Sequence, residues 1–152
     1  MIGMAQERIV ARPYVSGEVY AAVQHFYARQ MALLDEGSGD AWADTFSEDA
    51  VFAEPRMPEP LIGREAIRAS VHRTIAGHRD AGRTTRHWFG MLVVEPGPEG
   101  VLHTRSYALT MVTPSGGSVG ILGHAVCRDQ LVAAGDGQDY LVRHRDIAPD
   151  GV

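Results

Sequence analysis

Four runs of strand-forming residues follow one another in the second half of the chain. Short turn signals rich in glycine and proline separate them, at residues 96–100, 114–117 and 135–137. The runs cover residues 84–94, 101–113, 118–132 and 138–147. Connections this short join antiparallel neighbours, because parallel strands need a crossover of a dozen or more residues. The sequence therefore predicts an antiparallel meander.

Helices come before this meander. A stripe of apolar residues with helical spacing lies between the expected N-cap Ser16 and Gly37, and it predicts an amphipathic helix. Ile67, Val71 and Ile75 predict another, from Arg64 to about Gly77. A short helix (41–46), a strand (50–54) and a proline-rich loop (55–60) are expected between them. Helices followed by a curved antiparallel sheet make an α+β domain, and a sheet wrapped over helices encloses a cavity where ligands bind.

Length and composition narrow the class of protein. The 152 residues fit one domain, which we place at residues 16–150 after a loose arm at 1–15. The net charge of −5 argues against nucleic-acid binding, which requires a concentrated basic face. No apolar run is long enough to cross a membrane and no signal-peptide pattern opens the chain, so we expect a soluble cytoplasmic protein.

Two counts exclude whole classes of chemistry. All 14 basic residues are arginine, and without lysine the chain has no Schiff-base, pyridoxal phosphate or P-loop chemistry. The single cysteine, Cys127, excludes an internal disulfide framework and a cysteine-rich zinc site. We therefore expect an activity without a cofactor.

His87 is the first candidate for chemistry. Strict alternation in the strand 84–94 places His87, Phe89, Met91 and Val93 on one face, with Arg86, Trp88 and Leu92 on the other. An imidazole on an apolar wall is either a catalytic acid/base or a core histidine satisfied by a hydrogen bond. The strand alone favours the core histidine.

Asp35 is the second candidate. It lies in the last turn of the first helix, where the helix dipole disfavours negative charge. It also shares the inner stripe with Tyr27 and Met31 through four-residue spacing. An acid in this position either points to water beyond the core or has a partner across the cavity.

Four segments give the chain a family resemblance. They are LLDEGSGDAW (33–42) followed by FSEDAVF (46–52), LIGREAIR (61–68), the pair Arg86-His87, and DQLV (129–132) with Tyr140-Leu141-Val142 and Arg145. With these segments, residues 16–150 resemble the SnoaL-like branch of the nuclear transport factor 2-like superfamily. The resemblance implies a cone-shaped α+β barrel. This fold hosts cyclases, dehydratases, isomerases and non-catalytic binders, so fold alone does not give the function.

Within the superfamily, the chain looks most like polyketide cyclases and scytalone dehydratase. The resemblance implies a cofactor-free enzyme of secondary metabolism that moves protons on a hydrophobic polyketide-like molecule, by cyclisation, dehydration or isomerisation. It assigns the catalytic roles to His87 and Asp35. Tyr27, Tyr107, His103 or His124 could stabilise an enolate by hydrogen bonding. We expect the substrate to be contacted by Tyr27, Met31, Trp42, Phe52, Phe89, Met91, His103, Tyr107, His124 and Cys127.

The chain departs from the family pattern at three places. Cys127 and Tyr140 stand where relatives often have tyrosine and tryptophan, and no histidine is an unambiguous second catalytic residue; His103 and His124 are both candidates. Because of these departures, the resemblance does not decide between cyclisation, dehydration and isomerisation.

Other classes of function compete with this interpretation. His87, His103 and His124 lie on successive strands and would suit a metal if they converged, although no HxH or HExxH spacing is present. A non-catalytic binder would keep the cavity without a His87–Asp35 contact. If the protein is a subunit of a larger complex, a partner protein would cover the outer sheet face that carries Trp88 and Leu92. A second copy of this chain would cover that face equally well, and we expect a homodimer.

Overall fold

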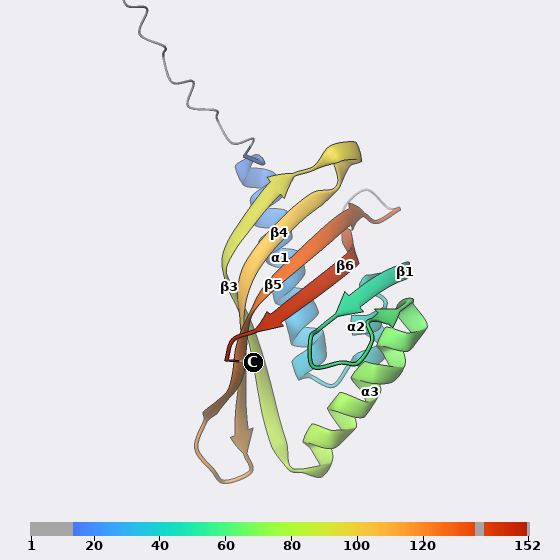
Figure 1. The fold of residues 1–152 in the computed structure, drawn as a ribbon. Coiled ribbons are helices and arrows are strands. Elements are labelled where there is room, and N and C mark those ends of the chain that lie inside the picture. The colour runs from blue at the N-terminus through green and yellow to red at the C-terminus, as the bar shows by residue number, and fades with distance from the viewer. Residues whose placement is uncertain (1–13, 136–138, 152) are drawn as a thin grey trace, which may run out of the picture.

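The computed structural model of the chain describes residues 14–135 and 139–151, and most of the predicted arm at 1–15 lies outside this part. Figure 1 shows the arrangement of its helices and strands. The helices are α1 (Gly17–Asp35), α2 (Gly39–Ala43), α3 (Arg64–Asp80) and the 3-10 turn η1 (Pro98–Gly100). The strands are β1 (Phe46–Ala53), β2 (Leu61–Ile62), β3 (Arg83–Pro96), β4 (Leu102–Pro114), β5 (Gly120–Ala133) and β6 (Tyr140–Pro149).

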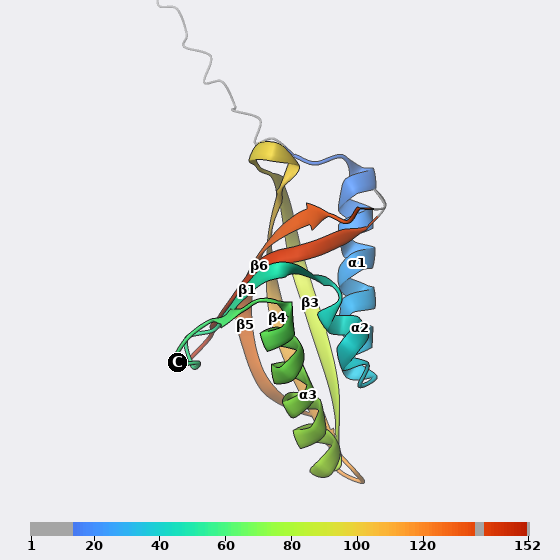
Figure 2. The same cartoon turned by 90° about the vertical axis from the view of Figure 1, so that its right-hand side faces the viewer.

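The strands form one curved sheet in the order β2-β1-β6-β5-β4-β3. Neighbours from β3 to β6 are antiparallel, which confirms the predicted meander. The early strand β1 joins the far side of this meander, parallel to β6. The sheet does not close on itself, since β2 and β3 remain at opposite edges. Figure 2 shows α1 and α3 on the same side of the curved sheet, which confirms the predicted α+β cone.

Helix α1 follows the predicted stripe. The Ser16 side chain accepts a hydrogen bond from the Val19 N–H at 3.2 Å, as expected of an N-cap. The buried face carries Val23, Phe26 and Tyr27 against the sheet. Because the buried residues of this face run from Val23 to Met31, the helix packs along the sheet, and it is in contact with β3.

A buried polar network holds the middle of α1 to the sheet. Arg145 on β6 and Asp129 on β5 are register partners, and their side chains are bonded at 2.8 and 2.9 Å. Arg145 also donates to Gln30 of α1 at 2.7 Å, while Asp129 accepts from the Tyr27 hydroxyl at 2.7 Å. These bonds fix both the axial position and the rotation of α1 relative to the strands.

One prediction about β3 is wrong because the strand contains a bulge. The pairing with β4 shifts between Gly90 and Val93, and Met91 has a left-handed backbone with φ of 53°. The extra residue reverses the alternation of side chains beyond this point. Leu92 therefore points inward and is 8% exposed, whereas Met91 points outward and is 74% exposed.

Candidate active site

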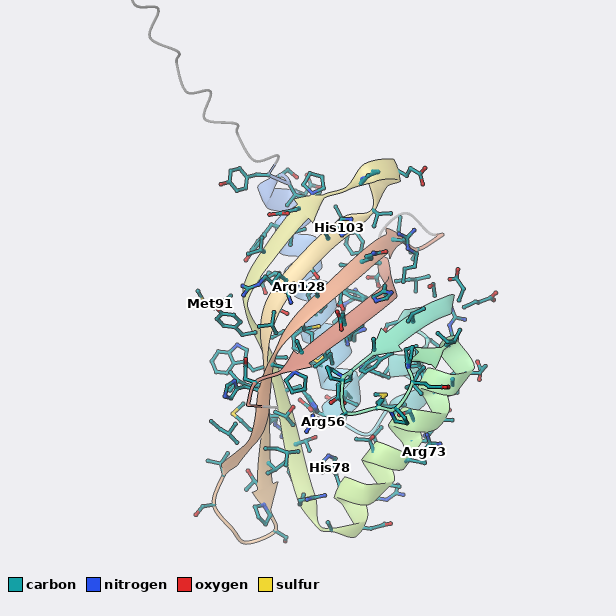
Figure 3. The ribbon with its side chains drawn as sticks, in the orientation of Figure 1. Arg56, Arg73, His78, Met91, His103 and Arg128 are labelled. Carbon is teal, nitrogen blue, oxygen red and sulfur yellow. The ribbon has the colours of Figure 1, made fainter. Side chains whose placement is uncertain are left out.

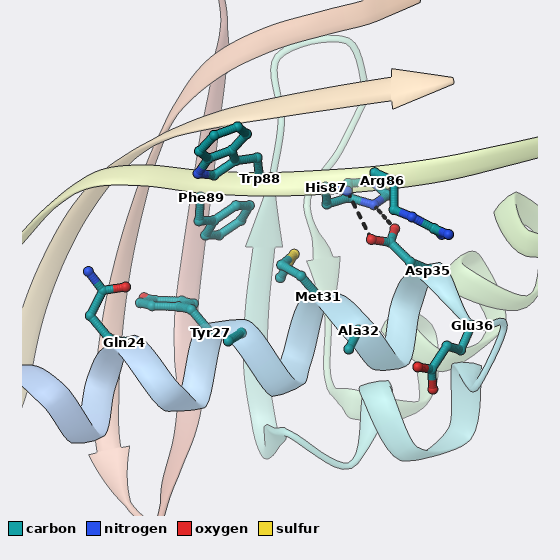
Figure 4. Close-up of a pocket in the computed structure, with 11 residues that line it drawn as sticks. Gln24, Tyr27, Met31, Ala32, Asp35, Glu36, Arg86, His87, Trp88 and Phe89 are labelled. Atoms are coloured by element: carbon teal, nitrogen blue, oxygen red, sulfur yellow. Dashed lines mark hydrogen bonds and ion pairs between the residues drawn. The ribbon is translucent and has the colours of Figure 1, made fainter. Parts of the chain in front are cut away.

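His87 and Asp35 are in direct contact. The His87 Nδ1 lies 2.6 Å from one Asp35 carboxylate oxygen, and the His87 backbone N–H donates to the other at 3.0 Å. The Thr85 hydroxyl adds a longer contact of 3.4 Å to Asp35. The two side chains are 20% and 10% exposed, respectively. Figure 4 shows this pair between the end of α1 and strand β3.

This contact explains the acid at the unfavourable end of α1. The helix dipole opposes a negative charge there by about 0.3–1 kcal/mol. Asp35 receives hydrogen bonds from the β3 residues His87 and Thr85, which offset this cost. Since a carboxylate only accepts, the Asp35 contact places the imidazole proton on Nδ1 and leaves Nε2 as the acceptor.

The pair lies at one end of a half-open groove of about 480 Å³. The groove runs between α1 and β3, the edge strand of the sheet (Figure 4). Its wall combines apolar and polar side chains. It is lined by Gln24, Tyr27, Ala28, Met31, Ala32, Asp35, Glu36, Arg86, His87, Trp88 and Phe89. The volume and the aromatic wall suit a small ring-containing molecule.

Three predicted contact residues, Tyr27, Met31 and Phe89, line this groove. Tyr27 contributes its ring rather than its hydroxyl. Its hydroxyl donates to Asp129 and accepts from Thr104 at 2.6 Å, and the ring packs on Phe89 with centroids 5.4 Å apart. Burial and the neighbouring Asp129 charge raise the pKa of Tyr27 well above its usual value. Tyr27 is thus held as a neutral donor to Asp129.

His78 is a functional candidate that the sequence reasoning missed. Its Nδ1 is buried and has no hydrogen-bond partner among the described residues. Burial lowers the pKa of His78, and the charges of Arg83 and His87 lower it further. Figure 3 shows His78 between α3 and the sheet. The spacing could have identified it, because His78 lies three residues after Ile75 and so continues the apolar stripe of α3. The sequence prediction ended this helix at about Gly77, whereas the helix runs to Asp80 and includes His78.

Other predicted contact residues lie in the core instead. Trp42 and Phe46 pack with centroids 4.7 Å apart, and Phe52 packs on Phe46. Cys127 is 1% exposed and donates to Asp129 at 3.5 Å. Burial, reinforced by the Asp129 charge, raises the pKa of the Cys127 thiol. Trp42, Phe52 and Cys127 do not line the groove, so their predicted contact with a substrate has no support from its geometry.

The remaining predicted residues lie away from the groove. Met91 and Tyr107 are exposed, and the Arg105 guanidinium lies over the Tyr107 ring. His103 lines a separate surface hollow with Arg105 and Arg128, and Figure 3 shows this region. His124 is exposed and bonded to Asp150 at 2.7 Å. None of these four side chains contributes to the groove.

The histidines do not assemble a metal centre. His87 faces α1, whereas His103 and His124 are exposed on other strands, so the convergence considered for a metal enzyme does not occur. Among residues 14–135 and 139–151, no three His, Cys, Asp or Glu side chains are grouped as metal ligands. No helix in the described part of the chain is long and apolar enough to cross a membrane.

Comparisons with solved structures find the same fold in other proteins. Aln2 from a Streptomyces species is 36% identical, with a TM-score of 0.81 over 90% of this chain and 94% of that one. ActVI-ORFA from Streptomyces coelicolor is 29% identical, with a TM-score of 0.79 over 88% and 99%. A protein from Catenulispora acidiphila, solved in complex with S-DNPA, is 34% identical, with a TM-score of 0.75 over 89% and 96%. No curated protein matches the chain.

The family model for the SnoaL-like domain matches residues 16–146, which include α1, the groove and nearly all of the sheet. A scytalone dehydratase-like protein from Novosphingobium aromaticivorans shares the fold at 19% identity, with a TM-score of 0.71 over 87% of this chain and 84% of that one. The resemblance detected in the sequence is therefore confirmed. The chain belongs to the SnoaL-like domain family.

Proposed function

We propose that this protein is a cofactor-free acid/base enzyme that acts on a polyketide-like aromatic or alicyclic molecule. The reaction is a cyclisation, dehydration or isomerisation that proceeds by proton transfer. The observation that carries the proposal is the 2.6 Å contact between His87 and Asp35 at the end of a ring-sized groove. A histidine oriented by a carboxylate is the arrangement that general acid/base chemistry uses.

The proposed step begins at the His87 Nε2. Asp35 holds the proton on Nδ1, so the Nε2 lone pair removes a proton from the carbon next to a substrate carbonyl. The C–H electron pair forms the enolate, and the new imidazolium is stabilised by Asp35. Returning the proton to another carbon gives isomerisation, and giving it to a leaving hydroxyl gives dehydration with release of water. Attack of the enolate carbon on a second carbonyl closes a ring and leaves an alkoxide, which takes the proton back from His87.

His78 lies near this site but does not line the groove. Its lowered pKa favours the neutral imidazole, which can accept a proton. In this proposal His78 is a second proton-transfer group only for a molecule that extends from the groove toward α3. One relative, the protein from Catenulispora acidiphila, was solved in complex with S-DNPA, which supports the proposal that this chain also binds a ligand.

The test measures proton exchange on a simple ketone. The purified protein is incubated in D₂O with 2-tetralone, whose carbonyl has acidic neighbouring protons, and deuterium uptake is followed by mass spectrometry. We expect His87→Gln to reduce the enzyme-dependent rate by about 10²–10⁴-fold, the usual contribution of general acid/base catalysis. Thermal unfolding checks that the variant remains folded.

A matched control is available in the chain itself. His124 and Asp150 form an equivalent histidine–carboxylate contact of 2.7 Å, but on an exposed part of the surface. His124→Gln should leave the exchange rate unchanged. If His87→Gln keeps the full rate, or if S-DNPA binds to a wild-type protein that catalyses no exchange, the protein is a binder and the catalytic proposal is wrong.

We also propose that the protein forms a homodimer through the outer face of the sheet. Several large apolar side chains are exposed on the strands, among them Met91 at 74% and Ile121 at 65%. Exposed apolar groups in such number are typical of an interface. Sedimentation of wild-type protein should give a dimer, and Met91→Glu with Ile121→Glu should give a folded monomer. A wild-type monomer at micromolar concentration would contradict this proposal.

A further inference from the structure

We infer that the backbone N–H of Phe89 binds the substrate's carbonyl oxygen in the groove and stabilises the enolate. This inference rests on the proposed function, since it concerns the same site and the same step. An acid/base mechanism needs a hydrogen-bond donor for the negative charge that develops on the oxygen. The four side chains expected to provide it are committed to other bonds or lie away from the groove, and the main chain of β3 offers a donor at the groove itself.

The expected side-chain donors are committed or distant. The Tyr27 hydroxyl already donates its proton to the Asp129 carboxylate, in a fully buried network. Tyr107 is exposed on β4, and His103 and His124 do not line the groove. None of the four can reach an oxygen bound beside His87.

The main chain of β3 offers a donor because this strand is at the edge of the sheet. In an antiparallel pair, alternate residues direct their N–H and C=O groups toward the partner and away from it. The His87 N–H bonds to Asp35, so His87 belongs to the set that faces away from β4. Phe89, two residues later and before the bulge, belongs to the same set. Its N–H therefore points to the free edge.

Side chains of α1 cover this edge on both sides of Phe89. Asp35 binds the His87 N–H on one side, and the Tyr20 hydroxyl donates to the Leu92 carbonyl at 2.9 Å on the other. Along this edge, the Phe89 N–H donates no hydrogen bond to another described residue. Phe89 and His87 both line the groove. An edge N–H that faces such a groove needs a partner, because an unmet donor is costly.

The spacing fits the proposed step. Residues two apart in a strand are separated by about 6.5 Å and point in the same direction. A carbonyl oxygen bound by the Phe89 N–H then places the neighbouring carbon toward the His87 imidazole. The proton moves to His87 while the charge develops on the oxygen that Phe89 holds. A backbone donor is suited to this role because the sheet fixes it before the reaction.

A proline substitution tests the donor directly. Phe89→Pro and Phe89→Ala both remove the ring, but only proline removes the N–H. Because that N–H faces the free edge, proline costs no hydrogen bond to β4, and the preceding residue is already extended as proline requires. Trp88→Pro is the matched control, since its N–H faces β4 and its loss should destabilise the fold strongly.

The readout is binding of 2-naphthol, whose ring and oxygen mimic the enol of 2-tetralone. We expect Phe89→Pro to bind it about five- to tenfold more weakly than Phe89→Ala, equivalent to one lost hydrogen bond. Equal affinities of the two variants would overturn the inference. Because binding is measured without turnover, a failure here is distinguishable from a failure of the His87 proposal.

A second measurement uses the wild-type protein and does not depend on the proline variant folding. In ¹⁵N-labelled protein, 2-naphthol should move the Phe89 amide proton downfield, as expected when it donates to an oxygen. Naphthalene, which has the same rings without the oxygen, should not. The Trp88 amide, which faces β4, serves as the internal control. No oxygen-dependent shift at Phe89 would refute the assignment.

Discussion

Asp35→Asn probes the contact on which the proposed function depends. The substitution keeps the shape and one acceptor oxygen, which can still accept from the His87 N–H. It replaces the other oxygen, which lies 2.6 Å from the His87 Nδ1, by an NH₂ group that can only donate. Two donors would then face each other at this short distance. The imidazole must then move its proton to Nε2 or turn away. Either change removes the lone pair that the mechanism requires.

The expected magnitudes follow from these contacts. The loss of one charge-assisted hydrogen bond costs about 1.5–3 kcal/mol, and removal of a negative charge from the end of α1 returns about 0.3–1 kcal/mol. The free energy of unfolding should fall by about 1–2 kcal/mol, which lowers Tm by about 2–8 °C in a domain of this size. Exchange of 2-tetralone protons should fall by about 10²–10⁴-fold.

Three measurements separate catalysis from structure. Thermal unfolding gives the stability loss, deuterium exchange gives the rate, and ¹⁵N spectra of the imidazole give the tautomer of His87. Asp150→Asn, which alters the exposed contact to His124, should leave all three unchanged. A normal exchange rate accompanied by the expected fall in Tm would show that Asp35 only stabilises the fold, and the reasoning would be refuted.

Three further predictions concern the groups around the site. Arg145→Met leaves the buried Asp129 carboxylate without its cation and should lower the free energy of unfolding by about 3–5 kcal/mol in urea titrations. The double variant Arg145→Met with Asp129→Leu should recover most of this lost stability. A loss below about 1 kcal/mol for Arg145→Met would be incompatible with a desolvated ion pair. The pKa of His78 is lower in the folded state than in the unfolded state, so between these two pKa values the unfolded chain binds more protons than the folded chain. The free energy of unfolding should therefore decline as the pH falls below about 6.5, the ordinary pKa of histidine. His78→Gln should remove that part of the decline, and identical pH profiles of the two proteins would argue against a buried neutral His78. Met91→Gly relieves a left-handed backbone and should raise stability by up to about 1 kcal/mol in the same titrations, unless the bulge is not present in solution.

Local patterns in the sequence determined the elements and their order. The stripe after Ser16 placed α1 against a core, and turn signals between the strands required antiparallel neighbours. The same periodicity put Asp35 on the buried side of the helix at its unfavourable end. These features depend on residues close together in the chain, where spacing and backbone preference act directly.

Only the tertiary structure decided which side chains share the groove. The bulge at Met91 reversed the inward and outward faces of β3, and a one-residue shift of this kind leaves no distinct trace in an alternating apolar run. Helix α3 extended one turn beyond its expected end and brought His78 toward the sheet. The free edge of β3 arose from strand order, with β1 joining β6 rather than β3. Long-range pairing fixed these features, because strand faces and edges depend on neighbours that are distant in sequence.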